Sequence, residues 1–224
     1  MPDGQYSFYL HSDDRTDIAA MATISTISQP LRGEFIRTAA TAGAVVYQVD
    51  ARLPALIPVF FAGQLSAARL CAVMALVSGT WSSLTGLPDE PENGEAALPM
   101  SPETEYQRRR YTLTLQNGRS GERVESVLTE ASSRLRGDLL RNLIITGLAL
   151  HTTAPELPRL LTSMPVPPTS VSELQALVQQ MAGTTAVNRA AAAAVPDTPA
   201  TSAMPVSGSD TREIKKNMRR AFGD

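Results

Sequence analysis

Hydroxyl, phenol and guanidinium side chains alternate with other residues in two short segments, one in each half of the chain, and these residues are suited to recognising a ligand. They are Ser7 and Tyr9 in the first segment and Arg110, Thr112 and Thr114 in the second. Side chains two residues apart on a β-strand point to the same face. Because side chains of these types contact base edges in the DNA major groove, we predict that these five read DNA bases. An ordinary solvated sheet face is the alternative.

A second set of polar residues precedes two apolar helical patterns. Ser28 and Arg32 precede the first pattern, and Ser132 and Arg136 precede the second. The start of a helix offers unpaired backbone amides and the positive end of the helix dipole, and both favour phosphate. We therefore predict that these four residues contact DNA phosphates. The alternative is that the serines only cap the helices and the arginines are solvated.

Further arginines recur near these positions. Arg37 and Arg141 lie about one helical turn beyond the helix starts, where an ion pair with helix-start acids and a phosphate contact are both open interpretations. The block from Arg108 to Arg110 is expected immediately before the second strand, either as an arm along the DNA backbone or as a solvated linker. Since the net charge is −2, any nucleic-acid surface must depend on such local placement of cations.

The sequence contains no constellation suited to catalysis. Its two histidines fall at a strand end and on a helix face, and the single cysteine, Cys71, has no histidine partner in its sequence context. Neither a glycine loop that would cradle phosphate nor the spacing of metal ligands occurs in the sequence. We therefore expect a protein that is not an enzyme and that uses no cofactor and no metal.

The elements that position these residues come from an internal duplication. Residues 31–43, LRGEFIRTAATAG, recur as residues 135–147, LRGDLLRNLIITG, at a shift of 104 (135 − 31 = 104). The strand-like segment at residues 6–10 recurs at 111–115, at a shift of 105 (111 − 6 = 105). A module of about a hundred residues has the size of a whole domain and is too long for a solenoid repeat.

Each module should contain one strand followed by two helices. Alternation predicts a half-buried strand at residues 5–11, and residues 12–14 supply cap chemistry for a helix. The expected buried positions of that helix are Ala20, Thr23, Ile24 and Ile27. In the helix that follows, the small residues Gly43 and Gly147 would let another helix approach closely.

A strand with two helices needs a second copy to complete its sheet, which is the ribbon-helix-helix arrangement. We predict a mainly α fold in which tandem ribbon-helix-helix repeats form a single-chain pseudo-dimer with a two-stranded antiparallel ribbon. The residues expected to cover the helices are Phe8, Leu10, Leu113 and Leu115. Ser7 and Tyr9 should oppose Thr112 and Thr114, which would permit an asymmetric DNA site.

Changes in composition divide the chain further. The predicted parts are a first repeat at residues 1–84, a linker at 85–109, a second repeat at 110–183, a disordered linker at 184–209 and a partner-binding tail at 210–224. Each repeat should end in an extra helical hairpin beyond Pro54 or Pro158. In the tail, Ile214, Met218 and Phe222 are four residues apart and form one helical stripe, which suits binding to a partner. A solvated charged tail is the alternative.

Residues 53–77 form the most apolar stretch of the chain. Pro58, Gln64 and Arg69 interrupt it, so we expect two packed helices and no membrane span. The absence of a signal-peptide pattern and the single Cys71 favour a reducing cytoplasm.

The block RGEFIRTAATAGAVVY at residues 32–47, followed by Asp50-Ala51-Arg52 and Pro54, resembles the core of the ParR (StbB-type) plasmid centromere-binding proteins. The segment DTREIKKNM at residues 210–218 is similar to that family's Lys-rich, Asn-containing tail. The resemblance covers both repeats and the tail. It implies a bacterial, plasmid-encoded DNA-binding adaptor of an actin-like (type II) plasmid partition system.

Carried over to this sequence, the resemblance implies that the ribbon binds tandem centromere repeats in double-stranded DNA and that the helical hairpins join neighbouring molecules into arrays. The tail residues that would engage an actin-like ParM-type ATPase filament are Ile214, Lys215, Lys216, Met218 and Phe222. The usual family member is a homodimer of one module. This chain is duplicated, so one ribbon would carry one tail instead of two.

Two other functions would use the same features. A ribbon-helix-helix transcriptional repressor of its own operon would use the same DNA surface without a filament partner. An accessory protein of a conjugative relaxosome would use its tail to recruit a relaxase or a coupling protein.

Overall fold

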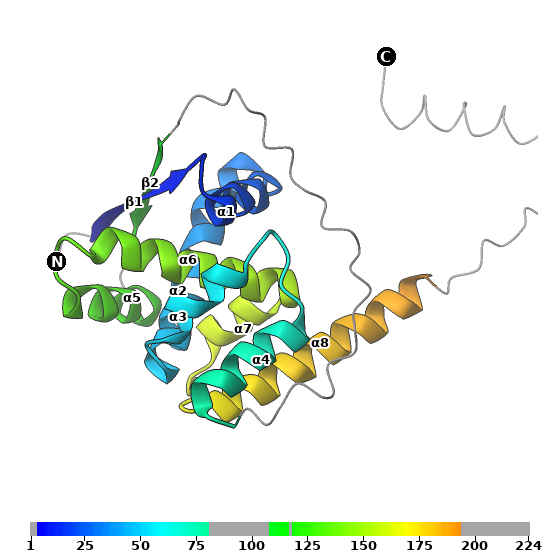
Figure 1. The fold of residues 1–224 in the computed structure, drawn as a ribbon. Helices are drawn as coiled ribbons and strands as arrows, with labels where there is room; N and C mark the ends of the chain where they lie inside the picture. Colours follow the sequence, from blue (N-terminus) through cyan, green and yellow to red (C-terminus); the bar gives the residue numbers. More distant parts are fainter. Residues whose placement is uncertain (1–3, 81–107, 117, 194–224) are drawn as a thin grey trace, which may run out of the picture. The chain divides into compact units, whose positions relative to one another are not determined.

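The computed structural model of this chain describes residues 4–80, 108–116 and 118–193, and in that part each repeat has one strand followed by four α-helices (Figure 1). The first repeat comprises β1 (Gln5–His11), α1 (Arg15–Ser25), the 3-10 turn η1 (Gln29–Leu31), α2 (Arg32–Val49), α3 (Leu53–Leu56), the 3-10 turn η2 (Ile57–Phe60) and α4 (Ala67–Ser78). The second comprises β2 (Arg108–Thr114), α5 (Arg119–Glu130), α6 (Arg136–Thr153), α7 (Leu157–Ser163) and α8 (Val171–Ala193). The predicted mainly helical fold with tandem repeats is confirmed.

β1 and β2 form a two-stranded antiparallel ribbon. Every second side chain faces the helices, as alternation along a strand requires. The buried positions are Phe8, Leu10, Leu113 and, just beyond β2, Leu115. Tyr111 joins this inner face, since its ring stacks on that of Phe8 with the two centroids 5.2 Å apart. The four residues predicted to cover the helices are thus confirmed.

β2 begins earlier than expected. Its first residue is Arg108, so the arginine block lies inside the strand and not before it, and the expected linker boundary at residue 109 falls within β2. The reason is the length of the partner strand. β1 extends to His11, so its last residues offer main-chain partners to the arginines of β2.

The register of the ribbon also differs in part from expectation. Ser7 lies opposite Thr112, as predicted. Tyr9 lies opposite Arg110, so the expected pairing of Tyr9 with Thr114 is wrong.

α1 ends at Ser25, also earlier than expected. Of its four predicted buried residues, Ala20 and Ile24 are buried, Thr23 is half-buried and Ile27 lies beyond the helix. The hydroxyl of Ser25 donates a hydrogen bond to the carbonyl oxygen of Ala22, and that of Thr26 donates to the carbonyl oxygen of Thr23, each at 2.7 Å. Such side-chain bonds to the main chain compete with a further helical turn.

α2 and α6 make the largest contact between two helices in the described part of the chain. Two glycines make that contact possible. A Cβ atom on Gly43 would collide with the main chain of Leu143, and one on Gly147 with the main chain of Ala39. The backbones of the two helices therefore touch directly, and the predicted close approach at both glycines is confirmed.

The most apolar stretch, residues 53–77, is divided among α3, η2 and α4, as expected. The Arg52 guanidinium before α3 donates from Nη2 to the carbonyl oxygen of Val77 at 2.9 Å and so holds the last turn of α4. Among the described helices, none combines the length and the apolar character that crossing a bilayer requires.

α4 and α8 lie side by side (Figure 1), and the buried Cys71 thiol on α4 is hydrogen-bonded to the side chain of Gln179 on α8. α8 continues past Gly183, where we expected the second repeat to end, because alanine-rich sequence has high helix propensity. Most of both expected linkers lies outside the described residues. So does the tail, with Ile214, Lys215, Lys216, Met218 and Phe222.

Candidate nucleic-acid interface

The outer face of the ribbon carries the side chains that the sequence predicts as DNA readers. Residues directly opposite each other in an antiparallel pair share a face. The pairs on this face are Gln5 with Thr114, Ser7 with Thr112, Tyr9 with Arg110, and His11 with Arg108. Arg110, Thr112 and Thr114 are exposed, while Ser7 and Tyr9 are half-buried. The structure brings all five predicted readers together on one surface, and their contact with bases stays a prediction.

Two arginines at one end of this face are held in place by their neighbours. Arg110 donates from Nε and Nη2 to the hydroxyl oxygen of Ser7, at 3.2 and 3.0 Å. The Arg108 guanidinium lies over the Tyr9 ring, 3.5 Å from its centroid, where the ring quadrupole attracts the cation. Both arginines are exposed, and these contacts fix the direction of their guanidinium groups. This end of the ribbon concentrates positive charge that the overall charge of −2 does not reveal.

The third arginine of the block lies on the other face. Arg109 is opposite Leu10, and its guanidinium lies 5.5 Å from the centroid of the Tyr111 ring. The block is therefore not one uniform arm. Sequence reasoning missed that Arg108 belongs to the outer face, although its spacing of two residues from Arg110 continues the period of the strand.

Arg32 and Arg136 occupy the first positions of α2 and α6. Arg32 Nε donates to the carbonyl oxygen of Ile27 at 2.8 Å, and Arg136 Nε donates to that of Ala131 at 3.2 Å. These acceptors are equivalent in the two repeats (131 − 27 = 104). Both guanidinium groups therefore hydrogen-bond to the turn before their helix, and each is half-buried.

The start of α6 lies beside the ribbon. A Cβ atom on Gly137 would lie 3.6 Å from the main-chain oxygen of Ser7. Ser28 and Ser132 are exposed just before the two helix starts, and the Ser28 side chain makes no cap hydrogen bond in η1, the described turn that follows it. Phosphate contacts by Ser28, Arg32, Ser132 and Arg136 stay a prediction.

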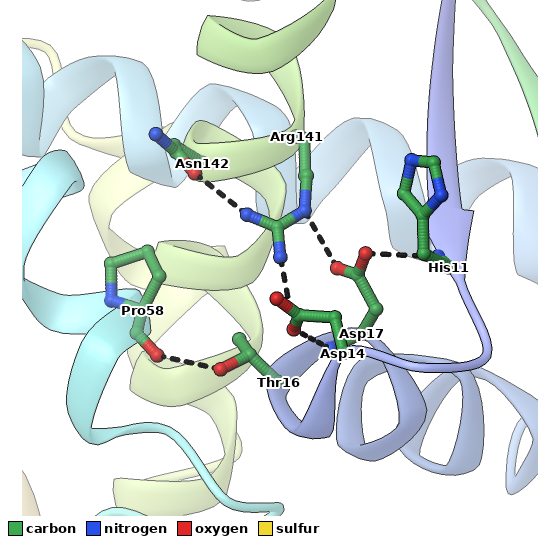
Figure 2. A network of polar contacts seen from close by, with 7 residues as sticks. All are labelled: His11, Asp14, Thr16, Asp17, Pro58, Arg141 and Asn142. Atoms are coloured by element: carbon green, nitrogen blue, oxygen red, sulfur yellow. Dashed lines mark hydrogen bonds and ion pairs between the residues drawn. The ribbon is translucent and has the colours of Figure 1, made fainter.

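Arg141 on α6 pairs with acids at the start of α1 in the other repeat (Figure 2). Its Nε lies 2.6 Å from Asp17 Oδ1, and its Nη2 lies 3.2 Å from Asp14 Oδ1. Asp14 also caps α1, since its side chain accepts a hydrogen bond from the Asp17 amide at 2.9 Å. The Asp17 side chain is 1% exposed. Burial raises the pKa of Asp17, while hydrogen bonds from Arg141 and from the His11 amide oppose that shift. The ion-pair interpretation of Arg141 is confirmed.

Arg37 occupies the equivalent place in the first repeat (141 − 104 = 37) but makes no ion pair with any residue that the structure describes. The residues that correspond to Asp14 and Asp17 are Gly118 and Gly121, which carry no carboxylate. Here Arg37 lines a cavity of about 280 Å³. The two repeats therefore differ in the surroundings of this arginine, because two aspartates in the first repeat are replaced by glycines in the second.

The histidine and the cysteine on helices take part in packing. The His151 ring meets Phe35 edge-on, with the centroids 5.0 Å apart, and Cys71 is buried. Within residues 4–80, 108–116 and 118–193, no three His, Cys, Asp or Glu side chains gather closely enough to hold a metal ion.

Each repeat supplies one strand to the ribbon and follows it with two helices, and the long second helices pack against each other. This arrangement defines the class of protein, a ribbon-helix-helix pseudo-dimer contained in one chain. A family model described as plasmid stability protein matches residues 4–74 and again residues 109–178, once in each repeat. The chain therefore belongs to the plasmid stability protein family, which gives it a role in plasmid maintenance. No curated protein and no solved structure matches the chain.

Proposed function

We propose that this chain is the DNA-binding adaptor of an actin-like (type II) plasmid partition system, of the ParR (StbB) type, and that it acts in the bacterial cytoplasm without catalysing a reaction. It binds tandem centromere repeats in double-stranded DNA through the outer face of the ribbon. The observation that carries this proposal is the exposed pair Arg108 and Arg110, oriented by Tyr9 and Ser7, in a member of the plasmid stability protein family.

A two-stranded ribbon has the width that the DNA major groove admits, so its outer side chains would meet base edges. The starts of α2 and α6, with Arg32 and Arg136, would then meet the phosphates that flank the groove. Gly137 near Ser7 supports this geometry, because it puts the start of α6 against the ribbon.

Array formation would use the helical hairpins. Three exposed large apolar residues lie at their turns: Val59 is 72% exposed, Phe60 48% and Val166 74%. Apolar side chains this exposed favour contact with another protein surface. The tail residues Ile214, Lys215, Lys216, Met218 and Phe222 would engage the ParM-like ATPase filament, as the resemblance implies.

The test is a footprint of the full chain on DNA that flanks its own gene, at two salt concentrations. We expect a series of evenly spaced protected repeats and an affinity that falls steeply with salt. The variant Arg108→Ala/Arg110→Ala should bind at least about tenfold more weakly. Arg69→Ala, on the exposed surface of α4, is the matched control and should bind like the original chain. Lack of any salt-sensitive DNA binding would rule the proposal out.

A repressor of its own operon is the second candidate, and the same outer ribbon face favours it. A single protected operator in place of a repeat series would support the repressor. Deleting residues 210–224 separates the two further. If the deletion causes plasmid loss while DNA binding stays intact, the result supports segregation. If plasmid inheritance is unchanged and only ribbon variants lose repression, the result supports the repressor. A pull-down with the tail peptide would show whether a relaxase or coupling protein is recruited instead.

A further inference from the structure

The ribbon has a pseudo-twofold axis at its centre. Ser7 and Thr112 are equivalent in the two repeats (112 − 7 = 105), and they lie directly opposite each other. An axis between them therefore relates the two strands. Gln5 is equivalent to Arg110 (5 + 105 = 110), and Tyr9 is equivalent to Thr114 (9 + 105 = 114). The axis therefore exchanges the pair of Gln5 and Thr114 with the pair of Arg110 and Tyr9.

The two ends of the outer face differ in chemistry. One end carries Arg110 and Tyr9, with Arg108 over the Tyr9 ring. The other end carries Gln5 and Thr114, which are both exposed and uncharged. Two cations lie on one side of the axis, and none of the paired outer residues on the other side is charged.

These side chains prefer different bases. Arginine binds the O6 and N7 atoms of guanine in the major groove, whereas glutamine binds the N6 and N7 atoms of adenine. The contact with Ser7 fixes the direction of the Arg110 guanidinium on the outer face. A symmetric dimer must present the same side chains to both half-sites, but a fused chain is free of that requirement.

We infer that the ribbon reads a non-palindromic DNA site in one orientation, with a guanine under Arg110 in one half-site and no corresponding guanine under Gln5 in the other. This inference rests on the proposed DNA binding and adds the residues that set specificity. On direct repeats, every bound chain points the same way along the DNA.

The experiment selects duplexes from a library of random double-stranded DNA with the full chain and determines the enriched motif. We expect a motif without twofold symmetry, in which replacing the guanine of one half weakens binding about fivefold to a hundredfold. Gln5→Arg should add a guanine to the other half and make the two halves of the motif more alike. Arg110→Gln should remove the guanine preference. Arg69→Gln on α4 is the matched control and should leave the motif unchanged. Because all three substituted residues are exposed, the variants should unfold at the same urea concentration as the original chain.

The outcomes separate this inference from the proposed function. A palindromic motif for the original chain would overturn the inference and leave DNA binding in place. So would a guanine preference that survives in Arg110→Gln, or enrichment of DNA without any motif. If no duplex is enriched even at low salt, the inference and the proposed function both fail.

Discussion

Arg141 Nε lies 2.6 Å from Asp17 Oδ1, and this ion pair joins the second repeat to the first. The pair is unequal in its environment, because the Asp17 side chain is 1% exposed and that of Arg141 is 20% exposed. For the equivalent arginine, Arg37, the residues that correspond to the two acids are the glycines Gly118 and Gly121. The role of the ion pair can therefore be tested at Arg141, with Arg37 in the same chain as the control.

Arg141→Met should lower the free energy of unfolding by about 3 kcal/mol, because it leaves the buried Asp17 carboxylate without its cation. Arg37→Met should cost less than about 1 kcal/mol, since no described residue forms an ion pair with it. Urea unfolding of both variants measures the difference. Equal losses of stability would contradict a structural role of the Arg141 pair.

Gly43→Ala should destabilise the chain by about 2–3 kcal/mol, because the added methyl group collides with the main chain of Leu143 and forces α2 and α6 apart. Gly183→Ala is the control in α8. A Cβ atom there meets nothing within 4 Å, so alanine should stabilise the chain by about 0.5–1 kcal/mol through its higher helix propensity. Thermal unfolding checks both changes. A neutral Gly43→Ala would mean that the two helices do not touch at this point.

The Cys71 thiol should react slowly with iodoacetamide in the native chain. Cys71 is 8% exposed, and its burial against α8 raises the pKa of the thiol above 9.0, which lowers the fraction of reactive thiolate. At pH 8 the unfolded chain should be alkylated at least about tenfold faster. Mass spectrometry of samples quenched over time measures both rates. Similar rates would show that α4 readily separates from α8.

Asp50→Asn should lower stability at pH 7 by about 0.5–1 kcal/mol, a small effect because the Arg52 side chain is 66% exposed. Hydrogen bonds from Arg52 hold the pKa of Asp50 below its ordinary value of 3.8. The folded state therefore binds a proton less readily than the unfolded state. This stabilisation is fully present above pH 3.8 and is lost as the pH falls through the lowered pKa. Urea titrations of both proteins from pH 7 down to strongly acidic solution would show the gap closing, and a constant gap would exclude this ionic origin.

The sequence predicts most of the fold because periodicity and duplication are local signals. Alternation places Phe8 and Leu10 inward, and the helical period places Gly43 and Gly147 at the crossing. The register of the ribbon, in contrast, is not determined by a local signal. Slipping one strand by four residues keeps every side chain on its face, so alternation alone cannot decide whether Tyr9 meets Arg110 or Thr114.

For a similar reason, the sequence does not predict that Arg141 forms an ion pair and that Arg37 forms none with a described residue. Both arginines follow nearly the same local sequence, and what distinguishes them lies in the other repeat, at Asp17 and Gly121. The sequence of each helix alone therefore favours neither the ion pair nor the phosphate contact. Only the packing of one repeat on the other decides between them.

The two strands of the ribbon belong to one polypeptide, so their pairing does not obey the mass action that governs a homodimer. A dimeric ribbon comes apart when its subunits are diluted, and its DNA affinity then depends on how much protein the cell makes. Here the fraction of intact ribbon is independent of dilution. A cell that makes only a few molecules of this chain would still have an intact ribbon in every one of them.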